Sequence, residues 1–235
     1  ISNTPDSSRA LLYNQLAQKS IPVDPVLSEL YARQAIFWAE RFGSPEELAL
    51  ANKIIGTLRL RSDETDSALL YLSKALKYIH ESGQSELEAQ IQNNLGIVYE
   101  RKSDFGNALL KYKLALKIHR QRNDYYRMAG SMQNLSNIFQ KTGRYFDAVR
   151  TMKEAMESLI KSGDTTGIEH FYNSLGVSYK SLARYYDARN CFFKAIAASG
   201  KNNSCNAKSA ALNNLASIYQ IWGDYDKALR YYQEA

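Results

Sequence analysis

Apolar and small side chains recur along this chain with a period of 40 residues. One column contains only alanine: Ala35, Ala75, Ala115, Ala155, Ala195 and Ala235. A second contains branched apolar residues and a third only small ones: Ile55, Leu95, Leu135, Leu175 and Leu215, then Gly56, Gly96, Ser136, Gly176 and Ala216. Because unrelated positions do not stay in phase over so many units, the pattern indicates stacked repeats rather than one globular core.

Each unit is predicted to contain two helices. In residues 86–122, apolar residues recur at helical spacing from Ile91 to Val98, and again from Phe105 after a polar break. The break is short, so the two helices should lie antiparallel as a hairpin. We predict first helices near residues 46–61, 86–102, 126–142, 166–182 and 206–222. Second helices are predicted near residues 25–42, 64–82, 105–122, 145–162, 185–199 and from 225 onward.

Further patterns predict how these helices end and pack. Capping boxes that begin at Ser44, Ser85 and Thr166 would start three of the first helices. Residues that tolerate the left-handed conformation would end the second helices: Gly43, Gly83, Asn123, Gly163 and Asn203. At the hairpin crossing we expect Gly96 to face Ala108. Tyr112 and its equivalents, Phe192 and Tyr232, would pack against the neighbouring unit.

These motifs resemble those of the tetratricopeptide repeat family. The resemblance covers roughly residues 46–235 and rests on Asn94-Leu95-Gly96-x-x-Tyr99, Ala108, Tyr112 and Ala115, with equivalents every 40 residues. It implies an all-α fold, a right-handed superhelical solenoid of antiparallel helix hairpins. The usual repeat is about 34 residues long, and the proline common near the end of its second helix is absent here. The longer unit resembles repeats of bacterial signalling proteins, spindle-orientation adaptors and kinesin light chains.

The two ends of the chain differ from its middle. Residues 1–42 are predicted to form a polar lead-in followed by capping helices, because Asp24-Pro25 starts a helix while Leu16-Ala17 is out of phase with Ile55-Gly56. Residues 43–235 are predicted to form five repeats. We expect the last repeat to be truncated, since Ala235 is a packing position with no capping sequence behind it.

The candidate chemistry argues against catalysis. His80, His119 and His170 have no metal-ligand companion at helical spacing, and we interpret the first two as surface residues near helix ends. No nucleophile motif or phosphate-binding glycine loop is present. We therefore predict a protein that is not an enzyme, with no cofactor and no metal site. Cys191 and Cys205 are predicted to be free thiols rather than a disulfide.

The net charge of +6 arises from acidic and basic residues mixed along every unit. Without a dense basic block, this charge favours acidic protein partners over nucleic acid. No run of about 18 apolar residues is present, so no membrane span is expected. We expect a soluble segment, and favour the extracytoplasmic part of a membrane-anchored bacterial protein over a cytoplasmic one. The sequence indicates no oligomeric state.

The resemblance implies that first helices line the concave face of the solenoid and contact a ligand there. The predicted peptide-binding residues are amides with a basic column beside them: Asn93, Asn94, Gln133, Asn134, Asn137, Asn173, Asn213 and Asn214, with Arg61, Arg101, Lys141 and Lys180. An amide donates and accepts together, which suits an extended peptide backbone. Two alternatives stay open. The Asn94 column could bond to neighbouring helices, and the basic column could be a solvated face.

Three classes of function compete. We predict a non-catalytic scaffold that binds a protein or an extended, acidic peptide in this groove. The alternative is a sensory or regulatory segment of a larger bacterial signalling protein, such as a histidine kinase, a nucleotide cyclase or a transcription regulator. Nucleic-acid recognition ranks last, because amides, rather than aromatic or basic side chains, repeat along the groove.

Overall fold

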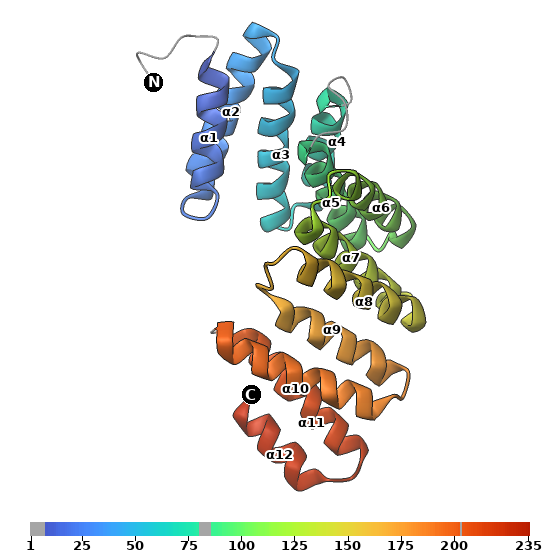
Figure 1. Ribbon diagram of the computed structural model, residues 1–235. Coiled ribbons are helices and arrows are strands. Elements are labelled where there is room, and N and C mark those ends of the chain that lie inside the picture. The colour runs from blue at the N-terminus through green and yellow to red at the C-terminus, as the bar shows by residue number, and fades with distance from the viewer. Residues whose placement is uncertain (1–7, 80–85, 203) are drawn as a thin grey trace. The chain divides into compact units, whose positions relative to one another are not determined.

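The computed structural model describes residues 8–79, 86–202 and 204–235, and within them the regular structure is entirely helical (Figure 1). The helices are α1 (Arg9–Ser20), α2 (Pro25–Phe42), α3 (Pro45–Arg61), α4 (Thr65–Ile79), α5 (Glu86–Arg101), α6 (Phe105–Gln121), α7 (Tyr125–Lys141), α8 (Tyr145–Lys161), α9 (Ile168–Ser181), α10 (Tyr185–Asn202), α11 (Cys205–Ile221) and α12 (Tyr225–Glu234). The predicted all-α class is therefore confirmed for the described residues.

The predicted helix boundaries agree with the structure to within about three residues wherever both ends are described. The difference at the start of α9 has a physical cause. Gly167 precedes the helix with a left-handed backbone (φ 81°), so α9 begins at Ile168 and the capping box predicted at Thr166 is wrong. No bounds are predicted for α1, which pairs with α2 as a further hairpin.

Aspartates rather than hydroxyl residues cap several of the helices. Ser44 stands at the N-terminal cap of α3, but its side chain makes no capping hydrogen bond, which corrects that prediction. Asp24, Asp124 and Asp224 do accept from the backbone N–H three residues on, at 2.9, 3.0 and 3.2 Å. Each bond satisfies one of the N–H groups that a helix start leaves without an intrahelical partner.

The predicted left-handed residues at the ends of second helices are confirmed where they are described. Gly43, Asn123 and Gly163 have φ values of 64°, 54° and 76°. Gly83 and Asn203 lie outside the described residues, as does the capping box predicted at Ser85.

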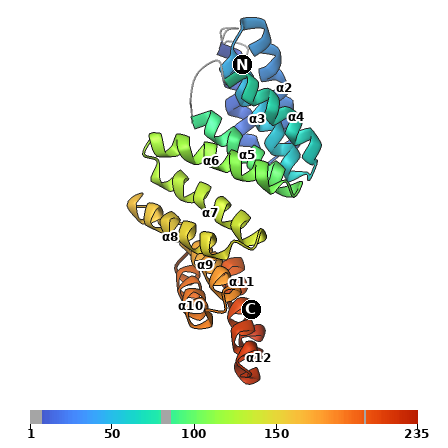
Figure 2. The same ribbon diagram turned by 90° about the vertical axis from the view of Figure 1, so that its right-hand side faces the viewer.

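The chain forms two compact units, residues 1–118 and 119–235, which are considered separately. In the N-terminal unit α1 packs on α2 and α3 packs on α4 as hairpins, while α2 contacts α3 and α4 contacts α5 between hairpins. In the C-terminal unit the hairpins are α7–α8, α9–α10 and α11–α12, with α8 against α9 and α10 against α11. Figure 2 shows the successive helices of each unit stacked side by side. Each unit is thus a stack of antiparallel hairpins.

The repeating columns form the core of both units. Five alanines of the 40-residue column are fully buried: Ala35, Ala75, Ala115, Ala155 and Ala195. The branched column is buried at all of its positions: Ile55, Leu95, Leu135, Leu175 and Leu215. Ala235 follows the end of α12 and is exposed. Because the same positions are buried in successive hairpins, the period of the sequence is also the period of the packing.

The packing at the small column differs from the expectation. The nearest atoms to a Cβ placed on Gly96 belong to the ring of Tyr112 rather than to Ala108, so this ring lies within its own hairpin. The same pairing recurs at Gly56 with Leu72 and at Gly176 with Phe192. Helices still approach closely in the α7–α8 hairpin, where Ser136 Oγ donates to the Ala148 carbonyl at 2.9 Å. The small residue therefore makes room for one large side chain of the partner helix.

A left-handed residue closes the turn inside five of the hairpins: Asp63, Ser103, Gly143, Ala183 and Gly223, with φ between 56° and 78°. Ala183, with φ 56°, is the residue least suited to the left-handed conformation, because its Cβ crowds the following carbonyl oxygen there. We expect Ala183→Gly to stabilise the C-terminal unit by roughly 0.5–1 kcal/mol in urea unfolding. Ala197→Gly, at an exposed position inside α10, is the matched control and should destabilise by a similar amount. If both variants changed the free energy of unfolding in the same direction, the backbone of Ala183 would not be strained.

Candidate binding surfaces on the first helices

The predicted amides lie at equivalent places on successive first helices. We call Asn93, Gln133, Asn173 and Asn213 the amide column. The first three are half-buried and Asn213 is exposed, although Leu212 and Leu215, close to Asn213 in the sequence, are buried. The column therefore lies at the edge of the core, where side chains are positioned by packing but still reach solvent.

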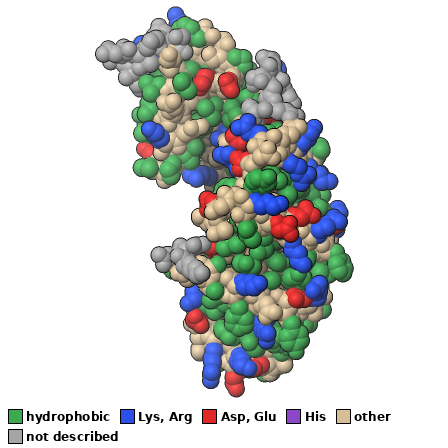
Figure 3. Space-filling view, in the orientation of Figure 1, with side chains coloured by type: hydrophobic (Ala, Val, Ile, Leu, Met, Phe, Trp, Pro, Cys, Tyr) green, Lys and Arg blue, Asp and Glu red, His purple; other side chains and the backbone are tan. Residues whose placement is uncertain are grey.

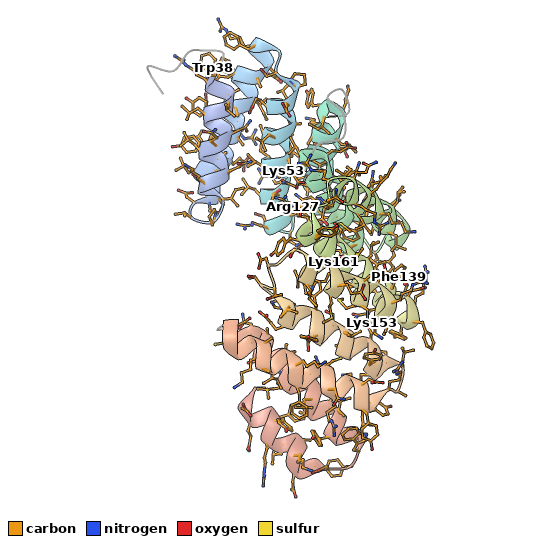
Figure 4. The ribbon with its side chains drawn as sticks, viewed as in Figure 1. Trp38, Lys53, Arg127, Phe139, Lys153 and Lys161 are labelled. Carbon is orange, nitrogen blue, oxygen red and sulfur yellow. The ribbon has the colours of Figure 1, made fainter. Side chains whose placement is uncertain are left out.

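Lys53 occupies the same column 40 residues before Asn93 and is not among the predicted residues. Its Nζ donates to Gln90 Oε1 at 3.0 Å, and Gln90 Nε2 donates to Glu86 Oε1 at 3.1 Å, so a polar chain joins α3 to α5. Burial lowers the pKa of the Lys53 ammonium, against the opposing effect of the Glu86 charge. The residue, labelled in Figure 4, could have been found by extending the 40-residue step beyond the amides.

Other predicted residues of the N-terminal unit connect neighbouring hairpins. Asn94 Nδ2 donates to Thr57 Oγ1 at 3.0 Å, between α5 and α3. Arg101 donates to the Leu60 carbonyl at 2.6 Å and to Asp63 Oδ1 at 2.8 Å. Arg61 similarly donates to the Ile21 carbonyl at 3.0 Å. These contacts give Asn94, Arg61 and Arg101 a structural role between hairpins.

In the C-terminal unit the structure brings three predicted residues together. Asn214 Nδ2 donates to Asn173 Oδ1 at 3.0 Å, and Lys180 Nζ lies 3.4 Å from Asn214 Oδ1 and 3.1 Å from Ser217 Oγ. Burial lowers the pKa of the Lys180 ammonium. The cluster links α9 to α11, so the column of Asn94 bonds between helices here as well.

Gln140, at the C-terminal end of α7, was also missed. Its Nε2 donates to the Ser174 carbonyl at 2.8 Å and to Ser178 Oγ at 2.7 Å, which joins α7 to α9. Asn134 and Asn137 are half-buried on the same helix, and Lys141 is exposed at its end. Peptide contact by any of the predicted residues stays a prediction.

The histidines and cysteines complete the candidate chemistry. His119, expected at the surface, is only 4% exposed, so that interpretation is wrong. His170 is exposed, and His80 lies outside the described residues. Cys191 and Cys205 are both free, as predicted.

Charges are interspersed on the face shown in Figure 3, where lysines and arginines lie among acidic and hydrophobic side chains. Several arginines pair with an aspartate three residues away, as Arg127 of α7 does with its N-terminal cap Asp124 at 2.6 Å. Within the described part of the chain, no helix is both long and apolar enough to cross a membrane.

Family comparisons identify the repeats in the C-terminal unit. Two sequence models described as tetratricopeptide repeat match residues 165–235 and residues 128–161. No curated protein matches the chain in sequence.

Solved structures extend the likeness to almost the whole chain. BtubC (BKLC) from P. vanneervenii is 20% identical, with a TM-score of 0.72 over 99% of this chain and 90% of that one. PH0952 from Pyrococcus horikoshii, a signal transduction ATPase with numerous domains and a tetratricopeptide repeat sensor, is 15% identical, with a TM-score of 0.81 over 99% of this chain but 37% of that one. A Rap protein complexed with competence and sporulation factor is 15% identical, with a TM-score of 0.71 over 97% of this chain and 75% of that one.

At these identities the likeness shows the fold alone. The fold is a stack of helix hairpins, which agrees with the repeats identified in the sequence. Residues 128–161 and 165–235 therefore match tetratricopeptide repeats, and the chain as a whole is similar in fold to proteins built from such repeats.

Proposed function

We propose that this chain is a non-catalytic scaffold that binds an extended segment of a partner protein along its first helices. The observation that carries the proposal is the amide column, whose members are half-buried or exposed at equivalent positions of successive hairpins. A peptide backbone offers a donor and an acceptor at every residue, and a carboxamide can satisfy both. Such groups, repeated on the successive first helices of the C-terminal unit, suit a partner recognised mainly through its main chain.

The packing around the column supports this role. Contacts such as Asn94–Thr57 in the N-terminal unit and Gln140–Ser174 in the C-terminal unit hold neighbouring first helices together, so each unit displays its own amides on a surface already fixed before binding. A preorganised surface loses less conformational entropy when it binds. In this proposal the residues of the Asn94 column support the surface. The amide column supplies the ligand contacts, although Asn173 also accepts from Asn214 of the next first helix.

We further propose that the partner segment is acidic. The net charge of +6 favours such a partner, and Lys53 places an ammonium in line with the amides. Arg61 and Arg101 contribute little to the attraction of an acidic segment, because both already donate hydrogen bonds to neighbouring hairpins. The affinity should therefore fall only moderately as salt is raised.

The test requires a cognate segment, obtained by affinity capture and narrowed with overlapping peptides from the captured protein. We expect the Asn93→Ala/Gln133→Ala/Asn213→Ala variant to bind that peptide about tenfold or more weakly, because each lost amide removes a hydrogen bond to the peptide backbone. Calorimetric titration measures the affinity, and thermal melting checks that the fold is retained.

The matched control is Gln34→Ala/Gln121→Ala/Gln233→Ala, which removes three exposed amides from the second helices α2, α6 and α12. It should bind like the parent. Parental affinity of the first triple variant, or an equal loss in the control, would show that the partner does not use the amide column.

The second candidate function is a sensory segment of a larger signalling protein. It is favoured by PH0952, in which a chain of this size would be one part of a multidomain ATPase with a tetratricopeptide repeat sensor. An extracytoplasmic position belongs to this alternative. Reading the coding sequence on both sides of the segment tests it: a catalytic or DNA-binding domain in the same chain is expected, and the absence of both would rule it out.

A further inference from the structure

A cleft of about 430 Å³ opens between α8, α9 and α10 in the C-terminal unit. Its base is apolar: Leu175 and Cys191 are buried, 6% and 8% exposed, and both contribute to the lining. Two tyrosines of α9, Tyr172 and Tyr179, form the aromatic wall. The cleft involves both second helices, α8 and α10, and is separate from the amide column.

The next hairpin shows what this space can hold. Forty residues after Cys191 stands Tyr231, whose ring stacks on Tyr219 with centroids 5.4 Å apart and an angle of 25° between the planes. Tyr231 and Phe193 also form a T-shaped pair with ring centroids 6.4 Å apart. The cleft has Tyr179 in the place of Tyr219, but Cys191 and Lys153 replace the other two rings. It is therefore an aromatic site from which the chain's own aromatic ring is missing.

Two lysines give the rim its charge. Lys153 Nζ, on α8 and labelled in Figure 4, lies 6.0 Å from the centroid of Tyr179. Lys194 Nζ, on α10, lies 5.6 Å from the centroid of Tyr172. Among the described residues neither ammonium has a carboxylate within ion-pair distance. Of the two acidic residues in the lining, Asp187 is paired with Arg184 at 2.7 Å, and Glu157 is exposed.

We propose that this cleft binds an aromatic side chain of a partner segment in which acidic residues flank the aromatic one. The ring would stack on Tyr179 as Tyr231 stacks on Tyr219, and offset stacking of this kind adds to the burial of the ring itself. The flanking carboxylates would pair with Lys153 and Lys194. This site does not depend on the amide column, so either site can exist without the other.

The first test uses the tripeptide Ac-Glu-Tyr-Glu-NH2 and the thiol of Cys191 in the full chain. Burial raises the pKa of this thiol to about 11, so its alkylation by iodoacetamide is slow enough to follow at pH 9. In a Cys205→Ser background, a saturating concentration of the peptide should slow the alkylation of Cys191 at least about threefold, because the bound ring covers the sulfur. The exposed Cys205, measured in a Cys191→Ser background, should react at an unchanged rate.

Variation of the peptide and of the lysines tests the chemistry. Ac-Glu-Ala-Glu-NH2 should give no protection, and Ac-Lys-Tyr-Lys-NH2 should bind at least about fivefold more weakly than the acidic peptide. The Lys153→Gln/Lys194→Gln variant should bind the acidic peptide about fivefold more weakly at low salt. Equal protection by the acidic and basic peptides would overturn the proposed pairing, and equal protection by the alanine peptide would overturn the aromatic site.

The Cys191→Tyr variant tests the cleft itself by placing in it the residue found at position 231. It should abolish the chemical-shift changes that the acidic tyrosine peptide causes in amide NMR spectra, whereas Cys205→Tyr, the matched control, should retain them. If Cys191→Tyr does not fold, the thiol-protection result decides alone. Protection of Cys191 that rises with protein concentration in the absence of peptide would identify a second copy of the chain as the occupant and contradict the proposal.

Discussion

Gly176→Ala is expected to destabilise the C-terminal unit by about 1–3 kcal/mol, although alanine is the better helix former. A Cβ on this residue would lie 2.5 Å from Cε1 of Phe192, a distance that requires the ring to move. Phe192 is fully buried, so its ring can move only by displacing other core side chains. Urea unfolding followed by circular dichroism measures the loss.

Gly130→Ala is the matched control. It introduces the same methyl group inside α7, where no atom other than those of its chain neighbours and of its own helix backbone lies within 4 Å of the new Cβ. Without a clash, the variant should be about 0.5–1 kcal/mol more stable than the parent, because alanine restricts the unfolded chain and favours the helix more than glycine does. A loss of stability in both variants would mean that the contact with Phe192 is not the cause.

Another hairpin of the chain shows which partner residue accommodates a larger side chain at this position. In the α7–α8 hairpin, Ser136 stands at the position of Gly176 and a fully buried Met152 at that of Phe192. Methionine is unbranched and adapts to a neighbouring atom that a rigid ring cannot avoid. The double variant Gly176→Ser/Phe192→Met should therefore lose less stability than the sum of its single variants, by about 0.5–3 kcal/mol. If the stability losses of the two single variants simply added, the small residue at 176 and the large residue at 192 would not be coupled.

The helices and their hairpin packing could be predicted because each column repeats the same physical requirement. Ala115 and Leu95 are buried for the same reason as their counterparts 40 residues away. The hairpin formed by α1 has no such support. Ala17 is fully buried and accepts from Ser28 Oγ at 2.8 Å, but it stands one residue out of phase with Gly56. Periodicity therefore indicated a helix only from Asp24 onward.

The details of packing could not be predicted from the period. A column shows which face of a helix a residue occupies, but not where a long side chain points from that face. The ring of Tyr112 therefore lies on Gly96, not against the next hairpin as expected. Likewise, the step from Cys191 to Tyr231 is visible in the sequence, but only the structure shows that the smaller residue leaves a cleft.

The candidate site could be predicted only as a set of residues on the first helices. Asn94 donates to Thr57 of the preceding hairpin, a contact that its amide side chain alone does not indicate. Side-chain identity does not distinguish an amide that binds a ligand from one that joins two helices. Lys53 was missed for a related reason, because the column was defined by residue type rather than by position.

Tyr112→Ala is expected to destabilise the N-terminal unit by about 3–5 kcal/mol, the cost of truncating a fully buried aromatic residue. Tyr112→Phe keeps the ring and removes only the hydroxyl, which donates to Glu100 Oε2 at 2.8 Å. It should cost about 1.5–3 kcal/mol at neutral pH, the usual value for a hydrogen bond to a charged group. Urea unfolding of both variants at pH 7 separates packing from hydrogen bonding.

The same residue makes the stability of the fold sensitive to alkaline pH. Burial raises the pKa of the Tyr112 phenol well above its ordinary value of about 10, and the charge of Glu100 raises it further. Above about pH 10 the unfolded chain loses this proton while the folded chain keeps it. The stabilisation is therefore fully present below pH 10 and falls by about 1.4 kcal/mol for each further pH unit. Tyr112→Phe lacks this proton, so the stability advantage of the parent over the variant should shrink by about 1 kcal/mol between pH 10 and pH 11, where the unfolded phenol passes from half to almost full ionisation. The other tyrosines are common to both proteins and cancel in the difference. An advantage that is the same at pH 8 and at pH 11 would show that the buried phenol is not held in its neutral form.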